Sequence, residues 1–258
     1  PDDLRDAIRT ALLDKLLDMA AAKEAPPPLP EGALLAEMLG VAAGEALPPE
    51  YVPMMVEELD PAAGTTRGMQ WRHGRPPAAV LARYPVVIIG AGMSGLLAAM
   101  RLQDAGFAFT IIEKNADVGG TWLENRYPGC GVDTPNHFYC YSFEPAHEWR
   151  QFFAKRDELW GYFKDTARRH DLVRHIRFGH EVEGAVHDAA TGRWQVTIRG
   201  PDGTRQTIDA AIVISAVGIL NRPKWPDIAG LADFAGPRLH TAQWDPAFAW
   251  QGKRIGMI

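Results

Sequence analysis

About a third of the way along the chain, the spacing of apolar residues changes from a purely helical pattern to a mixed one. Before that point, apolar residues recur every three to four positions over residues 1–22, which predicts an amphipathic helix. Two more helical stretches, over 33–45 and 49–59, follow after proline-bearing breaks. The following segment is rich in glycine and proline. It predicts an irregular connection in which Trp71 is the anchor.

From residue 85 onward, short apolar runs alternate with helical stretches. Strands at 86–89 and 108–112 flank a helix over 94–105. Further along we expect a helix over 158–170, an extended stretch over 176–186, a hairpin that pairs 194–198 with 205–211, and a central apolar strand at 211–215. The fold class is therefore α/β, with a parallel central sheet, a β-hairpin or meander insertion, and a small helical N-terminal extension.

Composition limits the function. The 258 residues are 47% hydrophobic, enough for a sizeable core, with a net charge of -5 and a pI near 5.9. This balance, without clustered Lys and Arg, argues against nucleic acid or a membrane surface as partner. No apolar run reaches membrane-spanning length and no secretory pattern begins the chain, so we expect a cytoplasmic protein. Cys130 and Cys140 stand in no CxxC or metal-ligand spacing, which argues against a disulfide framework and a metal site.

A glycine-rich loop follows the first strand and opens a helix. It reads Gly90-Ala91-Gly92-Met93-Ser94-Gly95. Gly90 permits a tight turn, Gly92 lets backbone approach a pyrophosphate, and Gly95 allows close helix packing. Glu113 ends the second strand, where a carboxylate accepts hydrogen bonds from ribose hydroxyls. This pattern predicts a Rossmann-like domain for FAD or NAD. A sharp glycine turn beside a surface acid is the plain alternative, and Ser94 is a cofactor contact or a helix cap.

A pair of glycines after the second strand favours a flavin as the bound cofactor. Gly119-Gly120-Thr121-Trp122 follows Glu113, and Asp133 comes later. Paired glycines let a second backbone segment approach the cofactor, and an indole with a carboxylate suits a large, flat, redox-active ring. Taken singly, Trp122 is explained by core packing and Asp133 by a turn cap, so their joint spacing carries the inference.

This region resembles a family signature. The spacing Gly119-Gly120-x-Trp122-x4-Tyr127-Pro128-Gly129-x3-Asp133 is similar to the shorter signature of the type I Baeyer-Villiger monooxygenases. That family's longer signature is matched at five positions: Phe234, Gly236, His240, Trp244 and Asp245. Trp244 favours this family over the N-hydroxylating flavin monooxygenases, which usually carry Tyr there. The helical extension and residues 130–139 resemble the hydroxyacetophenone monooxygenase branch.

The resemblance, which covers residues 85–258, implies a role for each matching position. The implied FAD contacts are Gly90, Gly92, Ser94, Gly95, Glu113, Gly120, Thr121, Trp122, Asp133, Tyr139 and the backbone of Val182. Asp133 is the implied catalytic residue, beside the flavin and partnered by an Arg that this chain does not identify. The longer signature implies a connection between domains. We assign His240 to that coupling and not to general-base catalysis.

The implied activity is enzymatic. It is the FAD- and NADPH-dependent insertion of one oxygen atom of O2 beside a ketone carbonyl, through a C4a-peroxyflavin, to give an ester or lactone. The implied partners are a small ketone, O2 and NADPH, and the N-terminal helices are a candidate homodimer contact. Two alternatives stay open: an N-hydroxylating flavin monooxygenase, or, for the chain as given, a non-catalytic FAD-binding or dimerisation module.

These patterns divide the chain into four regions. They are a helical extension at 1–60, a linker at 61–84, the N-terminal part of a Rossmann-like FAD-binding domain at 85–220, and at 221–258 an interdomain connection with the first strand of a truncated NADP-binding domain. Residues 252–258 resemble the strand before the glycine loop. We therefore expect a piece of a longer protein that is inactive alone, with its NADPH site mostly outside this span.

Overall fold

The computed structural model divides the chain into two compact units, residues 1–66 and 67–258, which are described separately. It describes residues 2–22, 30, 32–59, 69–144 and 147–258. The proline-rich stretch 26–30, which we expect to end the first helix, therefore falls almost entirely outside the described residues, as does the first part of the linker. None of the helices in these ranges combines the length with the apolar composition that a bilayer-spanning segment needs.

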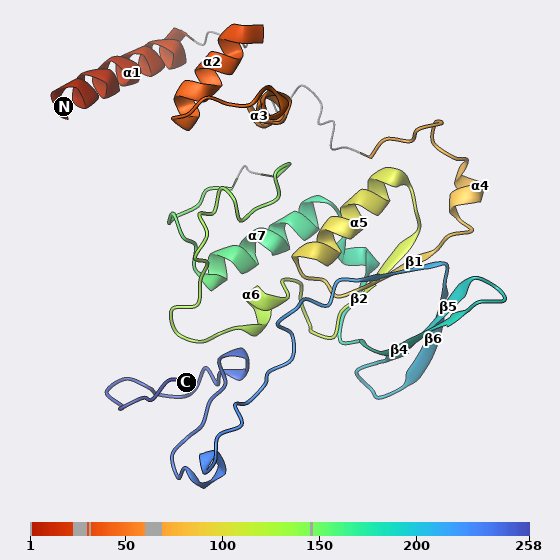
Figure 1. Cartoon of the computed structure of the whole chain (residues 1–258). Coiled ribbons are helices and arrows are strands. Elements are labelled where there is room, and N and C mark those ends of the chain that lie inside the picture. The colour runs from red at the N-terminus through yellow and green to blue at the C-terminus, as the bar shows by residue number, and fades with distance from the viewer. Residues whose placement is uncertain (1, 23–29, 31, 60–68, 145–146) are drawn as a thin grey trace. The chain divides into compact units, whose positions relative to one another are not determined.

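The first unit is helical, as predicted. Its elements are α1 (Asp2–Ala22), α2 (Gly32–Ala43), the 3-10 turn η1 (Pro49–Tyr51) and α3 (Val52–Leu59) (Figure 1). Leu35 and Leu39 of α2 are buried, whereas six large apolar side chains of α1 are each more than half exposed. The apolar stripe of α1 thus faces solvent.

A parallel four-stranded sheet in the order β3-β2-β1-β7 forms the centre of the second unit. The strands are β1 (Val86–Ile89), β2 (Phe109–Ile112), β3 (Ile176–Arg177) and β7 (Ile212–Ser215). All four residues of β1 pair with β2 on one side and with β7 on the other. The predicted α/β fold is confirmed.

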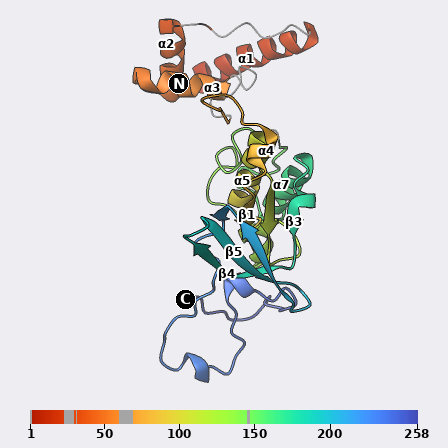
Figure 2. The same cartoon turned by 90° about the vertical axis from the view of Figure 1, so that its right-hand side faces the viewer.

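Alternate residues of the central strands face different layers. Val86 and Ile88 pack with α5 (Met93–Ala105) and α7 (Arg156–Arg169), whereas Val87 packs on the opposite side. The opposite layer is an antiparallel sheet of β4 (Glu181–Asp188), β5 (Arg193–Arg199) and β6 (Arg205–Ala210), which contains the predicted hairpin. The layers can be followed from the two directions of Figure 1 and Figure 2.

Several elements differ from expectation. β7 lies at the edge of the described sheet, with Ile212 38% exposed, and is not central. The predicted strand near the C-terminus does not form, because a strand needs a hydrogen-bonded neighbour and residues 253–258 pair with none in the described part of the chain. The stretch 176–186 is split between β3 and β4. Two short helices interrupt predicted loops: α4 (Ala78–Leu81) and α6 (Thr121–Glu124).

The described part of the linker is held to the second unit. The ring centroid of Trp71 lies 6.0 Å from that of Phe107. The guanidinium of Arg75 fills the space where Gly106 would carry a Cβ, with Nη2 1.8 Å from that position. Trp71 is therefore the anchor that the sequence predicts.

Candidate cofactor-binding site

A cleft of about 840 Å³ opens at the carboxyl ends of β1 and β2. Its lining comes from parts of residues 89–94 and 112–124, from Tyr139, and from residues 180–182 and 216–223. Ligands of open α/β sheets bind outside the carboxyl ends of the strands. The fold alone therefore makes this cleft a candidate binding site.

The first glycine loop lies where β1 passes into α5. Gly90 has a φ of +101°, and a Cβ there would lie 2.7 Å from the carbonyl oxygen of Ala216. A Cβ on Gly95 would lie 1.9 Å from the carbonyl oxygen of Gly90, so only glycine lets α5 pack this closely. The N-cap of α5 is Gly92, without a side-chain cap, which leaves the first N–H groups of the helix for an anion.

Glu113 joins the end of β2 to this loop. The residue is 4% exposed, and its two carboxylate oxygens accept hydrogen bonds from the backbone N–H of Ala91 at 2.7 Å and of Asn115 at 2.8 Å. The carboxylate lines the cleft and keeps lone pairs for a ribose hydroxyl. Ser94 also lines the cleft, and because Gly92 is the N-cap, Ser94 does not cap α5.

Gly119 and Gly120 bring a second backbone segment against the first loop. Gly119 has a φ of +123°, and its N–H donates to the carbonyl oxygen of Ala91 at 3.0 Å. Gly120 has a φ of +52°, and a Cβ there would lie 3.1 Å from the Cα of Gly92. The two glycine turns therefore meet without side chains between them.

Trp122 and Tyr139 form an aromatic wall of the cleft from separate parts of the chain. Trp122 is 8% exposed, and its Nε1 donates to Tyr139 Oη at 3.2 Å. The two rings are perpendicular, with centroids 5.6 Å apart. Thr121 beside this wall and Val182 at the start of β4 line the same cleft. The structure thus brings together the predicted contacts that flank both glycine turns.

Polar residues of the cleft were missed by the sequence reasoning. Lys114 Nζ lies 2.6 Å from Asn221 Oδ1 and 2.9 Å from Glu124 Oε1, and all three residues line the cleft. His180 and Arg222 line it as well. The only signal for Lys114 was its place after Glu113. His180, Asn221 and Arg222 reach the cleft through strand order and chain reversal, which leave no local pattern in the sequence.

Asp133 is not brought into the cleft. Its side chain is exposed, its Oδ1 accepts a hydrogen bond from Thr134 Oγ1 at 3.4 Å, and it is not a lining residue. A carboxylate without a cationic partner is more stable in water than in a dry site. Its predicted place beside the cofactor stays a prediction.

The longer signature lies on the segment after β7, and none of its five residues lines the cleft: Phe234, Gly236, His240, Trp244 and Asp245. The ring of Phe234 folds over Gly236, where a Cβ would lie 2.6 Å from it. His240 Nδ1 accepts the backbone N–H of Ala242 at 3.1 Å, which caps a 3-10 turn, Thr241–Gln243. Trp244 packs against Phe248, with ring centroids 6.2 Å apart. His240 thus has a local structural contact.

A parallel sheet, a glycine loop that opens a helix and a buried acid at the end of the second strand together define a dinucleotide-binding α/β protein. The comparison with known families gives the particular class. Residues 83–258 match the flavin-binding monooxygenase-like family. The chain belongs to this family.

Individual relatives agree with this assignment. An uncharacterized monooxygenase of Sinorhizobium fredii, y4iD, is 38% identical over 99% of this chain and 37% of its own length. A Baeyer-Villiger monooxygenase of Streptomyces coelicolor is 41% identical over 67% of this chain and 33% of its own length. The chain therefore spans about a third of the length of the curated relatives it matches.

Solved structures give the same picture. Cyclohexanone monooxygenase with bound ε-caprolactone has a TM-score of 0.60 at 34% identity, covering 66% of this chain and 34% of that one. OTEMO in complex with FAD and NADP has a TM-score of 0.58 at 34% identity, covering 66% of this chain and 32% of that one. At this level of identity, the likeness extends from fold to sequence.

Proposed function

We propose that the chain is the FAD-binding portion of a Baeyer-Villiger monooxygenase that uses NADPH and O2 to convert a ketone into an ester or lactone. The observation that carries the proposal is the convergence of two glycine turns, Glu113 and the aromatic wall on one cleft. The similarity to a Baeyer-Villiger monooxygenase and to a cyclohexanone monooxygenase supports it.

The cleft suits FAD in shape and chemistry. Gly92 and Gly120 leave a side-chain-free passage that a Cβ would fill, and a pyrophosphate needs such a passage. The uncapped start of α5 would hold the pyrophosphate, Glu113 would hold the ribose, and Trp122 with Tyr139 would bound the ring system. When bound, FAD supplies the redox-active ring that takes electrons from NADPH and reacts with O2.

The remaining predicted roles extend this proposal. The backbone of Val182 would lie near the adenine, and Thr121 would contact the cofactor beside Trp122. Asp133 would act at the ring only when an Arg of the NADP-binding domain pairs with it and offsets the cost of drying its carboxylate. Under the same proposal, residues 85–220 form the N-terminal part of the FAD-binding domain. Residues 221–258 form the connection that leads to the NADP-binding domain. The cytoplasmic location stays a prediction.

We further propose membership of the hydroxyacetophenone monooxygenase branch and a homodimer contact through α1. The helix exposes six large apolar side chains, each 53–59% exposed: Leu4, Ile8, Leu12, Leu13, Leu16 and Leu17. A matching helix of a second copy would remove them from water. Sedimentation velocity should show a dimer for the chain and a monomer for Leu12→Glu with Leu16→Glu. A monomeric chain without substitutions would contradict the contact.

FAD titration tests the cofactor. The chain should quench FAD fluorescence, and Glu113→Gln should weaken binding about tenfold or more, because the amide loses one acceptor and leaves a buried backbone N–H without a partner. The matched control is Glu148→Gln, a carboxylate that is exposed on a loop. No quenching by the chain, or equal losses for both variants, would contradict the proposed site.

A further inference from the structure

Helix α7 lines no part of the cleft, yet it bonds to both segments that carry the aromatic wall. One segment runs from Val118 to Trp122, and the other runs from Tyr139 to Glu144. Both segments are loops apart from the single turn of α6, so their positions depend on contacts made elsewhere in the fold. Two residues of α7, Trp160 and Tyr162, hold the segments through ring side chains. Arg169 of α7 also pairs with Glu144 in the second segment, and Arg156 donates to the carbonyl oxygen of Leu123 beside the first.

Trp160 holds the first segment. Its Nε1 donates to the carbonyl oxygen of Val118 at 2.9 Å, and its Cδ1 lies 2.7 Å from where Gly119 would carry a Cβ. Arg156 and Lys164 place their cationic groups 4.5 Å and 4.2 Å from its ring centroid. The indole is therefore fixed from its two neighbouring turns of α7 while it supports the second glycine turn.

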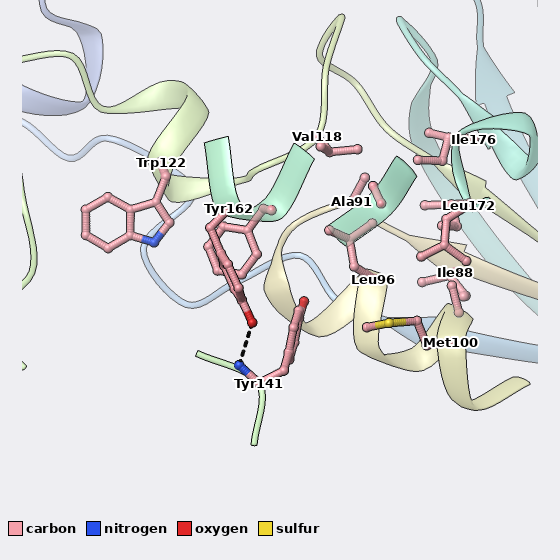
Figure 3. Close-up of a cluster of buried hydrophobic side chains, with 14 of the residues drawn as sticks. Ile88, Ala91, Leu96, Met100, Val118, Trp122, Tyr141, Tyr162, Leu172 and Ile176 are labelled. Atoms are coloured by element: carbon pink, nitrogen blue, oxygen red, sulfur yellow. Dashed lines mark hydrogen bonds between the residues drawn. The ribbon is translucent and has the colours of Figure 1, made fainter. Parts of the chain in front are cut away.

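Tyr162 holds the second segment. Its side chain is fully buried, and its Oη accepts the backbone N–H of Tyr141 at 2.9 Å and donates to the carbonyl oxygen of Glu144 at 3.1 Å. Figure 3 shows the bond to Tyr141 within the buried cluster that also contains Trp122. Burial raises the pKa of Tyr162 to about 12, so the phenol keeps its proton and stays a donor at physiological pH.

Tyr141 connects this segment back to the first glycine loop. Its Oη donates to the carbonyl oxygen of Met93 at 2.6 Å, and Met93 opens α5 and lines the cleft. Tyr139 of the aromatic wall is two residues away. A chain of hydrogen bonds thus runs from α7 through the second segment to the backbone that would hold the pyrophosphate.

We propose that Trp160 and Tyr162 are positioning residues that set the aromatic wall against the flavin ring from behind. This inference rests on the proposed FAD site. It assigns to α7 a function in cofactor geometry that core packing alone would not give. Removal of either polar contact, with an aromatic ring kept at the position, should then loosen the wall more than the rest of the unit.

Hydrogen exchange of the chain without FAD tests the positioning. Trp160→Phe should speed exchange at residues 118–124, and Tyr162→Phe should speed it at 139–144, each about tenfold, while β5 keeps its protection. Tyr84→Phe, the same chemical change at an exposed tyrosine, should alter neither segment. Val196→Ala, a cavity in the other hydrophobic cluster, should speed exchange in β5 but not in the wall segments.

FAD supplies the second readout. At saturating FAD, Trp160→Phe and Tyr162→Phe should change the visible circular dichroism of the bound flavin and weaken binding about tenfold, whereas Val196→Ala should do neither. Uniformly faster exchange in the α7 variants, or an unchanged flavin spectrum, would overturn the positioning role. Failure of the unsubstituted chain to bind FAD would instead overturn the proposed function, and the exchange result would still decide the role of α7.

Discussion

Gly95 and Gly161 are both glycines within helices, but the space around them predicts opposite effects of a methyl group. A Cβ on Gly95 would lie 1.9 Å from the carbonyl oxygen of Gly90, whereas a Cβ on Gly161 would meet nothing within 4 Å. Gly95→Ala should destabilise the second unit by about 1–3 kcal/mol through overpacking. Gly161→Ala should stabilise it by roughly 0.5–1 kcal/mol, because alanine has the higher helix propensity.

Urea unfolding of the two variants and of the unsubstituted chain measures both changes in the free energy of unfolding. Destabilisation by both substitutions would contradict the open space around Gly161. Neutral behaviour of Gly95→Ala would show that α5 can move away from the loop without cost.

Single residues were predictable where their reason is local. The roles of Gly90, Gly95 and Glu113 follow from one turn and one strand end, and the structure places them accordingly. Tyr162 and Lys114 had no such local reason, because Tyr141 lies 21 positions from Tyr162 and Asn221 lies 107 positions from Lys114 in the sequence. A polar contact between distant segments exists only after the fold has formed.

At the scale of elements, the anchoring contacts of the linker predict different stabilities for two truncated chains that differ in length by eight residues. Removal of residues 1–68 keeps Trp71 on Phe107 and Arg75 on Gly106, whereas removal of residues 1–76 takes both contacts away. The shorter truncation should leave the melting temperature of the second unit and its FAD binding unchanged, since both contacts of the linker with the second unit remain.

The longer truncation should cost roughly 1–3 kcal/mol, because it exposes the apolar surface that the indole covers. Thermal unfolding by circular dichroism of the two truncated chains measures the difference. Equal melting temperatures would show that Trp71 is not an anchor.

The antiparallel sheet should make the second unit sensitive to acid. Asp209 accepts hydrogen bonds from Arg193 Nε at 2.9 Å and from Gln195 Nε2 at 2.8 Å. The hydrogen bond from Arg193 lowers the pKa of Asp209 below its ordinary value of 3.8. A carboxylate with a lowered folded-state pKa stabilises the fold above the unfolded pKa, and this contribution disappears as the pH falls through the folded pKa.

Asp209→Asn should therefore melt below the unsubstituted chain at pH 7, and the difference should shrink as the pH falls below 3.8 and through the folded-state pKa of Asp209. The effect is small because the ion pair is exposed to solvent. Asp227→Asn, at an exposed aspartate after β7, is the control and should melt like the unsubstituted chain both at pH 7 and below pH 3.8. A gap that stays constant with pH would contradict the assignment.

Long elements were predictable and single-turn elements were not. The periodicity of α1, α5 and α7 extends over three or more turns, which identifies a helix from sequence. The four residues of α4 and of α6 are too few to show a period. The edge position of β7 was not predicted, because an apolar run does not determine which strands lie beside it.

At the scale of the molecule, the proposed domain division predicts a contrast between this chain and a longer parent protein that would contain it. The chain spans about a third of its relatives, and no residue of the signature at 234–245 reaches the cleft. We expect the parent, loaded with FAD, to consume NADPH faster when a ketone is added and to form an ester or lactone. The 258-residue chain should bind FAD but show no such turnover, because we propose that the NADPH site and the cationic partner of Asp133 lie outside these 258 residues.

Substitution of Asp133 in both proteins provides a control for that comparison. Asp133→Asn should lower ketone oxygenation by the parent roughly a hundredfold, through loss of a charge at the reacting centre. The same substitution should leave FAD binding by the 258-residue chain unchanged, because the side chain does not line the cleft. Product analysis by mass spectrometry with a panel of ketones and amines distinguishes the two monooxygenase classes. Oxygenation of amines alone would favour the N-hydroxylating class, and turnover by the 258-residue chain would contradict the division of labour between the two parts.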